Sequence, residues 1–215
     1  ELFSAAYRPI LNLRIARVML GAFTGAGLGL CGVALQAVLR NPLAEPYLLG
    51  TSSGAGLGAV IGVVLGVSAV YLPATAFAGA VATMFLVYVL AQENGLIRMH
   101  SLILSGVIVA VALSGLTVFM VSITPDEAVH GMMWWLLGSL QTFNIPLLVT
   151  AGLAVTIGGV VLSFFSRDLN AICLGEETAL YTGVEVETVK KIVFVTTALI
   201  TGALVSITGM IGFVG

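Results

Sequence analysis

Charge is scarce in this sequence: 8% of its 215 residues are Asp, Glu, Lys or Arg, whereas 59% are hydrophobic. The mean hydropathy is correspondingly high, at +1.14. Because soluble domains usually contain about 25% charged residues, so few charges could not cover a surface that faces water. The composition therefore excludes an ordinary soluble domain and predicts a protein whose main solvent is lipid.

Groups that couple ions or carry out catalysis are missing from the apolar parts of the chain. No Asp, Glu, Lys, Arg or His lies deep within an apolar run, where proton- and sodium-coupled transporters usually place them. The sequence has no Walker-type loop, no HExxH motif and no His, Asp and Glu cluster with metal-ligand spacing. The histidines, His100 and His130, fall in predicted loops on opposite faces, too far apart to share a site. We expect no catalytic residue, cofactor or metal, and energy that enters from outside the membrane.

Cysteine is also rare, and the two that occur, Cys31 and Cys173, lie in different segments. This separation favours neither a disulfide framework nor a metal site, and each is best interpreted as a small apolar filler. The first twenty residues lack an apolar stretch followed by a small-residue cleavage site, so we expect no signal peptide.

What the sequence does contain is six apolar runs, each long enough for the roughly 20 residues that cross a bilayer core. We expect an all-α integral membrane protein, a polytopic bundle of about six transmembrane helices that forms one domain over residues 1–215. The segment 132–144 contains Trp134 and Trp135 and is compatible with a short interfacial helix. The six runs are 18–39, 47–67, 72–92, 102–123, 146–165 and 192–214.

Two series of glycines repeat every four residues within these runs. Four-residue spacing places glycines on one helix face, where another backbone can approach closely. Chance is the alternative, because the chain contains 26 glycines. We interpret both series as packing surfaces. They are Gly21, Gly25 and Gly29, and then Gly54, Gly58, Gly62 and Gly66.

The basic residues predict which way the helices run. Alternate threading puts the loops 40–46, 93–101 and 167–191 on one side, which carries five basic residues, whereas the other connections carry none. The positive-inside rule makes the first side cytoplasmic. The N-terminal stretch is then external although it contains Arg14 and Arg17, which share a helix face. They are either arginines that reach toward the lipid interface or a docking point for acidic groups.

The longest cytoplasmic connection, 167–191, predicts two short helices. The first breaks at or just before Gly175, and the second ends at Gly183, which suits a helix C-terminus. Glu176 and Glu177 fall in a first turn, where carboxylates favour the helix dipole, and residues 179–180 offer a small apolar face. This pair of helices is either an attachment point for another protein or a solvated connector.

Several segments together resemble one family. The stretch 35–56, LQAVLRNPLAEPYLLGTSSGAG, closely resembles the signature of FecCD-type permeases, the membrane subunits of ABC importers for iron-siderophores, haem and cobalamin. The segments 102–107 (LILSGV), 135–139 (WLLGS) and 169–183 with its LGEE core match in the same order. The final segment 209–215, GMIGFVG, is similar to a helix ending of the family.

The resemblance implies a homodimer or pseudo-dimer of ten-helix permease subunits in a bacterial or archaeal inner membrane. Its partners would be two cytoplasmic ATP-binding subunits and an extracytoplasmic substrate-binding protein, with no nucleic acid. The permease would not be an enzyme, because the ATPase subunit hydrolyses ATP. The six runs would be helices two to seven, so the chain resembles a fragment of a permease or an unusually short one. The rival interpretations are a secondary transporter or channel without an ATPase, and a membrane scaffold or polytopic enzyme.

The resemblance also implies roles for particular residues. Arg14 and Arg17 would pair with glutamates of the binding protein, and Met99 and His100 would lie near the cytoplasmic gate. No residue is identified as a determinant of cargo. The element that couples to the ATPase would include Leu174, Gly175, Glu176, Glu177, Ala179, Leu180 and Gly183. The signature loop consists of Asn41, Pro42, Leu43, Ala44, Glu45 and Pro46.

Overall fold

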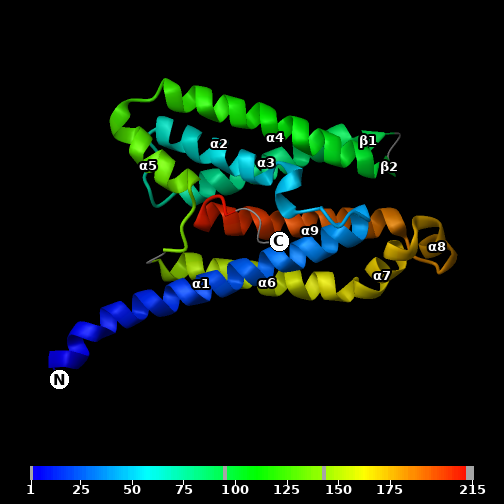
Figure 1. Ribbon diagram of the computed structural model, residues 1–215, viewed down its shortest axis with the longest axis horizontal. Coiled ribbons are helices and arrows are strands. Elements are labelled where there is room, and N and C mark those ends of the chain that lie inside the picture. The colour runs from blue at the N-terminus through cyan, green and yellow to red at the C-terminus, as the bar shows by residue number, and fades with distance from the viewer. Residues whose placement is uncertain (1, 94–95, 142–143, 212–215) are drawn as a thin grey trace.

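The computed structural model describes residues 2–93, 96–141 and 144–211 as a bundle of helices with one very short hairpin (Figure 1). The predicted all-α membrane fold is therefore confirmed. In chain order the elements are α1 (Leu2–Leu39), the 3-10 helix η1 (Pro46–Leu49), α2 (Thr51–Val64), α3 (Leu72–Ala91), β1 (Gln92–Glu93), β2 (Leu96–Ile97), α4 (Met99–Ser122), α5 (Asp126–Leu136), α6 (Ile145–Phe164), α7 (Ser166–Leu174), α8 (Glu176–Tyr181) and α9 (Val186–Thr208).

Five of the described helices are long and apolar enough to cross a membrane: most of α1, and α3, α4, α6 and α9. The second predicted run, 47–67, is instead divided into η1 and the 14-residue α2, which is only about 21 Å long at 1.5 Å per residue. Two glycines set these limits. Gly50 separates η1 from α2 with a φ of 72°, and Gly66 follows α2 with a φ of 71°, a left-handed conformation that glycine adopts at no steric cost.

Helix α1 is longer than the predicted run 18–39. Its 38 residues extend for about 57 Å, and its N-terminal part projects beyond the other helices (Figure 1). Helix α5 differs from the predicted segment 132–144, because it begins after Pro125 and ends before Gly138, whose φ is 73°. The two histidines were wrongly assigned to loops: His100 lies in the first turn of α4 and His130 lies within α5.

Helix α9 lies at the centre of the bundle and contributes to all three groups of core residues. Its Val193 and Leu204 pack with α1, α6, α7 and α8. Its Phe194 packs with α1, α3 and α4, and its Val205 packs with α2 and α3. Helices α1, α2, α3 and α6 are therefore all direct neighbours of α9.

The two glycine series have different surroundings. In α2, a Cβ atom added at Gly58 would lie 3.1 Å from the Cα of Gly79 in α3, and one added at Gly54 would lie 2.6 Å from the Gly79 carbonyl oxygen. Gly62 similarly faces Thr75 of α3. Gly66, by contrast, was wrongly placed on this face, because α2 has already ended and no atom lies within 4 Å of an added Cβ.

The three glycines of the predicted series in α1 meet little within the described part of the chain. A Cβ at Gly21 would touch a Leu140 side-chain carbon at 3.6 Å, but one at Gly25 or Gly29 would meet nothing within 4 Å. Contacts among the described residues therefore do not support the predicted packing surface at Gly25 and Gly29. A four-residue glycine repeat indicates a face where a backbone can approach, and it does not say whether one does.

The helices alternate in direction, so the connections gather at two ends of the bundle (Figure 1). We call one end the α8 end; it contains residues 40–46, the β1–β2 hairpin and the α7–α8 segment. We call the other the α5 end; it contains α5, the connection between α2 and α3, and the start of α1. The three loops that the basic residues predict to be cytoplasmic all lie at the α8 end.

Candidate functional site

The α7–α8 segment (residues 166–181) owes its shape to two glycines. Gly175 separates the helices with a φ of 137° and a ψ of 144°, a region that is essentially restricted to glycine. Gly183 ends α8 with a φ of 84°. Its N–H donates to the Leu180 carbonyl at 3.0 Å, while the Val184 N–H donates to the Ala179 carbonyl at 3.1 Å, which is the Schellman pattern. The prediction of two short helices divided at Gly175 and ended by Gly183 is confirmed.

One side of this segment is fixed to the bundle. Leu169 and Ile172 of α7 and Ala179 of α8 are buried in the same core group as Val38 of α1 and Val189 of α9. Burial of these apolar groups holds the segment against α1 and α9. Ala179 was predicted to form an exposed face together with Leu180, and that part of the prediction is wrong, because Ala179 is fully buried.

The other side of the segment is apolar and exposed. Leu174 and Leu180 are largely exposed, Glu177 is exposed, and Tyr181 is 92% exposed. Large apolar side chains at the tip of a loop, outside the apolar helices, are typical of a surface that contacts another protein. Tyr181 was not among the predicted site residues, although an aromatic residue directly after Leu180 in a predicted loop was a usable signal.

A buried lysine connects this segment to the rest of the α8 end. Lys190 of α9 has only 3% of its side chain exposed, and its Nζ donates to Glu176 Oε2 at 2.8 Å and to Glu187 Oε1 at 2.9 Å. The second oxygen of Glu187 accepts the Ile97 N–H at 3.2 Å. From the sequence, Lys190 was only one of the five basic residues that predict the cytoplasmic side. Its i, i+3 spacing from Glu187 was visible, but the contact with Glu176 was not.

The signature loop forms a turn held by its own hydrogen bonds. Arg40 ends α1 in the left-handed region, with a φ of 48°. Asn41 Oδ1 accepts the Leu43 N–H at 2.9 Å, and Gln36 Nε2 donates to the Pro42 carbonyl at 3.1 Å. An Asn side chain that accepts from the backbone two residues later is a common turn device. Pro42 and Leu43 project into solvent.

The remaining signature residues lead into η1. Ala44 and Pro46 are buried, Glu45 is half-buried at the N-terminus of η1, and Pro46 occupies its first position, where proline lacks only an N–H that would be unpaired anyway. The Tyr47 hydroxyl donates to the Ile211 carbonyl at 2.7 Å. The loop therefore sets the direction in which η1 and α2 follow α1, and it places residue 47 beside residue 211.

The segments that carry the family resemblance also meet in pairs. A Cβ at Gly106, in segment 102–107, would clash with the Leu48 carbonyl, so α4 touches the backbone of η1. The Ser139 N–H donates to the Thr208 carbonyl at 2.7 Å. A Cβ at Gly138 would lie 2.7 Å from the Met210 carbonyl oxygen. The matching motifs are thus mainly sites of close backbone packing.

The predicted gate lies at the start of α4. The hairpin pairs Gln92 with Ile97, and helix α4 follows directly. Arg98 forms a 2.9 Å salt bridge with Glu93, in which both side chains are more than half exposed. His100 is exposed at the same end; the Met99 backbone begins α4, and its side chain lies outside the described residues.

The predicted docking arginines lie at the α5 end. Arg14 and Arg17 are both exposed on the projecting part of α1, and the salt bridges of the described residues involve neither. A groove of about 500 Å³ lies beside them, lined by α1 and by residues of α6 such as Ile145 and Leu148. Two exposed positive charges beside an apolar groove can bind an acidic partner that also has apolar surface.

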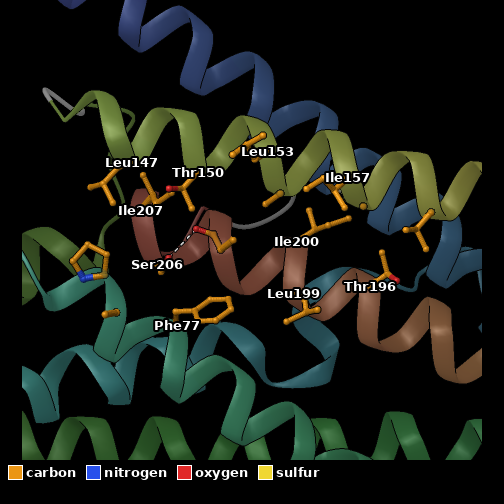
Figure 2. Close-up of a pocket in the computed structure, with 16 residues that line it drawn as sticks. Phe77, Leu147, Thr150, Leu153, Ile157, Thr196, Leu199, Ile200, Ser206 and Ile207 are labelled. Atoms are coloured by element: carbon orange, nitrogen blue, oxygen red, sulfur yellow. Dashed lines mark hydrogen bonds between the residues drawn. The ribbon is translucent and has the colours of Figure 1, made fainter.

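An apolar groove lies between α3, α6 and α9 (Figure 2). Its volume is about 610 Å³, and Phe77, Leu153 and Ile200 are among the side chains that point into it. The hydroxyls of Thr150 and Ser206 donate to carbonyls of their own helices, at 2.8 Å in each case. The groove therefore offers little polar recognition, and it is not a site for a polar cargo.

Comparison with known proteins gives consistent results over the whole chain. The sequence model of the FecCD transport family matches residues 2–215. The cobalamin import system permease protein BtuC of Halobacterium salinarum is 38% identical over 205 residues, which is 95% of this chain and 55% of that protein. The ferric enterobactin transport system permease protein FepD of Escherichia coli is 35% identical over 99% of this chain and 64% of that protein.

Two further relatives extend the comparison. The hemin transport system permease protein HmuU of Yersinia pestis is 33% identical over 95% of this chain and 63% of that protein. The structure of a metal-chelate type ABC transporter in an inward-facing conformation has a TM-score of 0.87 and 28% identity, over 97% of this chain and 68% of that one. The chain thus spans 55–64% of the length of the curated relatives named here.

Proposed function

This chain belongs to the FecCD transport family, and we propose that it is a membrane-spanning part of the permease of a binding-protein-dependent ABC importer. A separate ATPase subunit hydrolyses the ATP, and the chain itself performs no chemistry. The cargo is a metal chelate of the iron-siderophore, haem or cobalamin class, by analogy with the cargoes that the relatives' names give. The importer lies in the inner membrane of a bacterium or archaeon, with the α8 end in the cytoplasm.

The observation that carries this proposal is the α7–α8 segment. Its buried side is packed against α1 and α9, and its other side presents Leu174, Leu180 and Tyr181 to solvent. An exposed apolar tip on a firmly packed base suits a rigid contact with a second protein. We propose that this contact receives the movement of the ATPase, so the segment acts as a coupling element.

The movement of the ATPase would then be transmitted through the membrane by movement of the helices. The α2 and α3 backbones touch at Gly54, Gly58 and Gly79, so this pair moves as one body. Tightly packed elements switch between discrete arrangements and do not deform continuously. We propose alternating access in which such bodies rock, along a path whose lining carries no charge, as suits a bulky chelate.

The α5 end would face the binding protein, and a second permease subunit would complete the pathway. Arg14 and Arg17 supply exposed positive charge on the part of α1 that projects furthest. Carboxylates of a binding protein would pair with them, and such exposed pairs contribute mainly to orientation and association rate. We propose that this surface is where the loaded binding protein docks.

The test is uptake by the full-length permease in proteoliposomes, with its cognate ATPase subunit and binding protein. ATP-dependent accumulation of a ferric siderophore, haem or cobalamin, supplied on its binding protein, is the expected result. Uptake that is driven by a proton or sodium gradient without the ATPase would overturn the proposal in favour of a secondary transporter. Failure of the ATPase subunit to copurify with the permease would equally contradict it.

A further inference from the structure

We propose that Lys190 is a positioning residue that joins the α7–α8 segment to the β1–β2 hairpin and α4, so that movement of α8 is transmitted to the predicted gate. This inference rests on the proposed function, because it assumes that a partner moves α8. It concerns three parts of the chain that are distant in sequence: Glu176 begins α8, Glu187 lies in the first turn of α9, and Ile97 ends the hairpin.

The contacts form an unbroken chain. The Lys190 ammonium donates to Glu176 at 2.8 Å and to Glu187 at 2.9 Å, and Glu187 accepts the Ile97 N–H at 3.2 Å. Glu176 directly follows Gly175, whose φ of 137° marks the bend between α7 and α8. A rotation of α8 about this bend would move the Glu176 carboxylate. Lys190 is the charged residue of α9 that this carboxylate contacts, among the residues that the structure describes.

Little solvent reaches the Lys190 side chain, which is 3% exposed. Its stem lines a void of about 10 Å³ together with Leu102 of α4 and Phe194 of α9, and a void of this size is at the lower limit for one water molecule. Ionic hydrogen bonds are stronger where the local dielectric is low. The link between α8 and the hairpin is consequently direct, and no solvent layer that could absorb the motion separates the groups.

Stability alone does not account for this lysine. Removing an ammonium from water is costly, and apolar replacement of a buried ion pair is often neutral or stabilising. Here both carboxylates keep some contact with solvent, since their side chains are 40% and 33% exposed. A methionine at position 190 would leave them solvated, so the fold is expected to tolerate it. The charge is better explained by the segments that it connects.

The chain offers a matched control in Arg98. This residue also forms a 2.9 Å salt bridge at the α8 end, with Glu93 of the same hairpin, but the two side chains are 63% and 51% exposed. Exposed pairs of this kind contribute little, and the salt bridge that α8 forms among the described residues does not involve Arg98. Replacing either cation removes one positive charge from the same end of the molecule, so a general charge effect would appear in both variants.

The experiment compares Lys190→Met, Lys190→Arg and Arg98→Gln in the full-length permease with its ATPase subunit and binding protein in proteoliposomes. The measured quantity is cargo transported per ATP hydrolysed. In Lys190→Met we expect normal copurification of the ATPase subunit and this ratio lowered by roughly five- to tenfold, within the range of typical couplings between sites. Lys190→Arg should restore most of the ratio because it keeps the donors, and Arg98→Gln should leave it unchanged.

A purely structural role would lower transport and ATP hydrolysis together, in proportion to the amount of folded protein, and would overturn the proposal. A wild-type ratio in folded Lys190→Met would also overturn it. If that variant does not fold, Glu187→Gln decides, because the glutamine oxygen can still accept the Ile97 N–H, whereas the charge and the second acceptor, which receives Lys190, are lost; an unchanged ratio there would contradict the link. Failure of the proposed function is separate, since the wild-type protein would then show no ATP-driven uptake.

Discussion

The two ends of the bundle use their charged residues in different ways. At the α8 end, Lys190 is buried between two glutamates, and Arg98 is paired with Glu93. At the α5 end, Arg14 and Arg17 are exposed on a projecting helix and take part in no salt bridge of the described residues. Lys190 and Arg98 at the α8 end thus hold parts of the chain together, whereas the two exposed arginines at the α5 end are available to another molecule.

The apolar exposure of the two ends also differs. The α8 end presents a compact apolar tip at Leu180 and Tyr181, on a segment whose other face is buried. The α5 end presents a long helix with apolar residues on several sides, such as Leu11 and Val18. A compact tip suits a partner that transmits force, and an extended charged helix suits a partner that docks and leaves.

The largest expected effect is a loss of stability when the close packing of α2 against α3 is disrupted. Gly58→Leu would force α2 and α3 apart, because even a Cβ there lies 3.1 Å from the Gly79 Cα. We expect a loss of about 3 kcal/mol in stability, the upper part of the range for overpacked cores, measured as a lower thermal unfolding temperature of the purified permease in detergent.

The matched control is Gly25→Leu in α1. It makes the same residue change in a glycine series with the same four-residue spacing, but an added Cβ at Gly25 would meet nothing within 4 Å. Its unfolding temperature should stay close to that of the wild-type protein or rise slightly, since leucine has the higher helix propensity. Equal destabilisation by both changes would contradict the contrast between the two glycine series.

A smaller effect should follow from straining the bend in the α7–α8 segment. Gly175→Ala places a side chain at a φ of 137°, which costs about 1–3 kcal/mol for such outliers. We expect ATP hydrolysis to continue while uptake per ATP falls. Gly66→Ala is the control, since its φ of 71° lies in an open turn at the α5 end. It should lower stability by about 1–2 kcal/mol and leave uptake per ATP unchanged.

The smallest effect concerns the exposed arginines. Arg14→Glu combined with Arg17→Glu should leave the unfolding temperature unchanged and weaken association with the loaded binding protein. Exposed charges that lie farther apart than the Debye length are largely screened by salt, so the difference from wild type should be larger at about 20 mM than at about 500 mM ionic strength, where the screening lengths are roughly 21 Å and 4 Å. Equal affinities at low salt, measured by surface plasmon resonance, would remove these residues from the docking surface.

The overall architecture was predictable because the bilayer constrains it strongly. Long apolar runs in a chain with few charges must form helices, since every backbone group needs a partner inside lipid. The bends at Gly175 and Gly183 were also predictable, because glycine marks the ends of short helices. The limits of the helices were less predictable. Gly50 divides the second apolar run into η1 and α2, and the hydropathy of that run does not mark the break.

Long-range contacts were not predictable from local patterns. Gly25 and Gly58 belong to similar repeats, yet only Gly58 faces another backbone, because that depends on which helix lies beside it. Ala179 and Leu180 are neighbours, and burial of one and exposure of the other depends on how α8 lies against α1 and α9. The pairing of Lys190 with Glu176 joins two helices across a turn and needed the structure.

The most direct test of the contrast between the ends is chemical cross-linking in the assembled importer. Tyr181→Cys and Arg14→Cys would each be introduced into a permease in which Cys31 and Cys173 are replaced by alanine, and treated with a thiol-to-amine cross-linker in inside-out and right-side-out vesicles. The proposed orientation of the two ends predicts that position 181 links to the ATPase subunit, with a yield that changes on ATP binding, and that position 14 links to the binding protein. Linkage of position 14 to the ATPase subunit, or of position 181 to the binding protein, would contradict it.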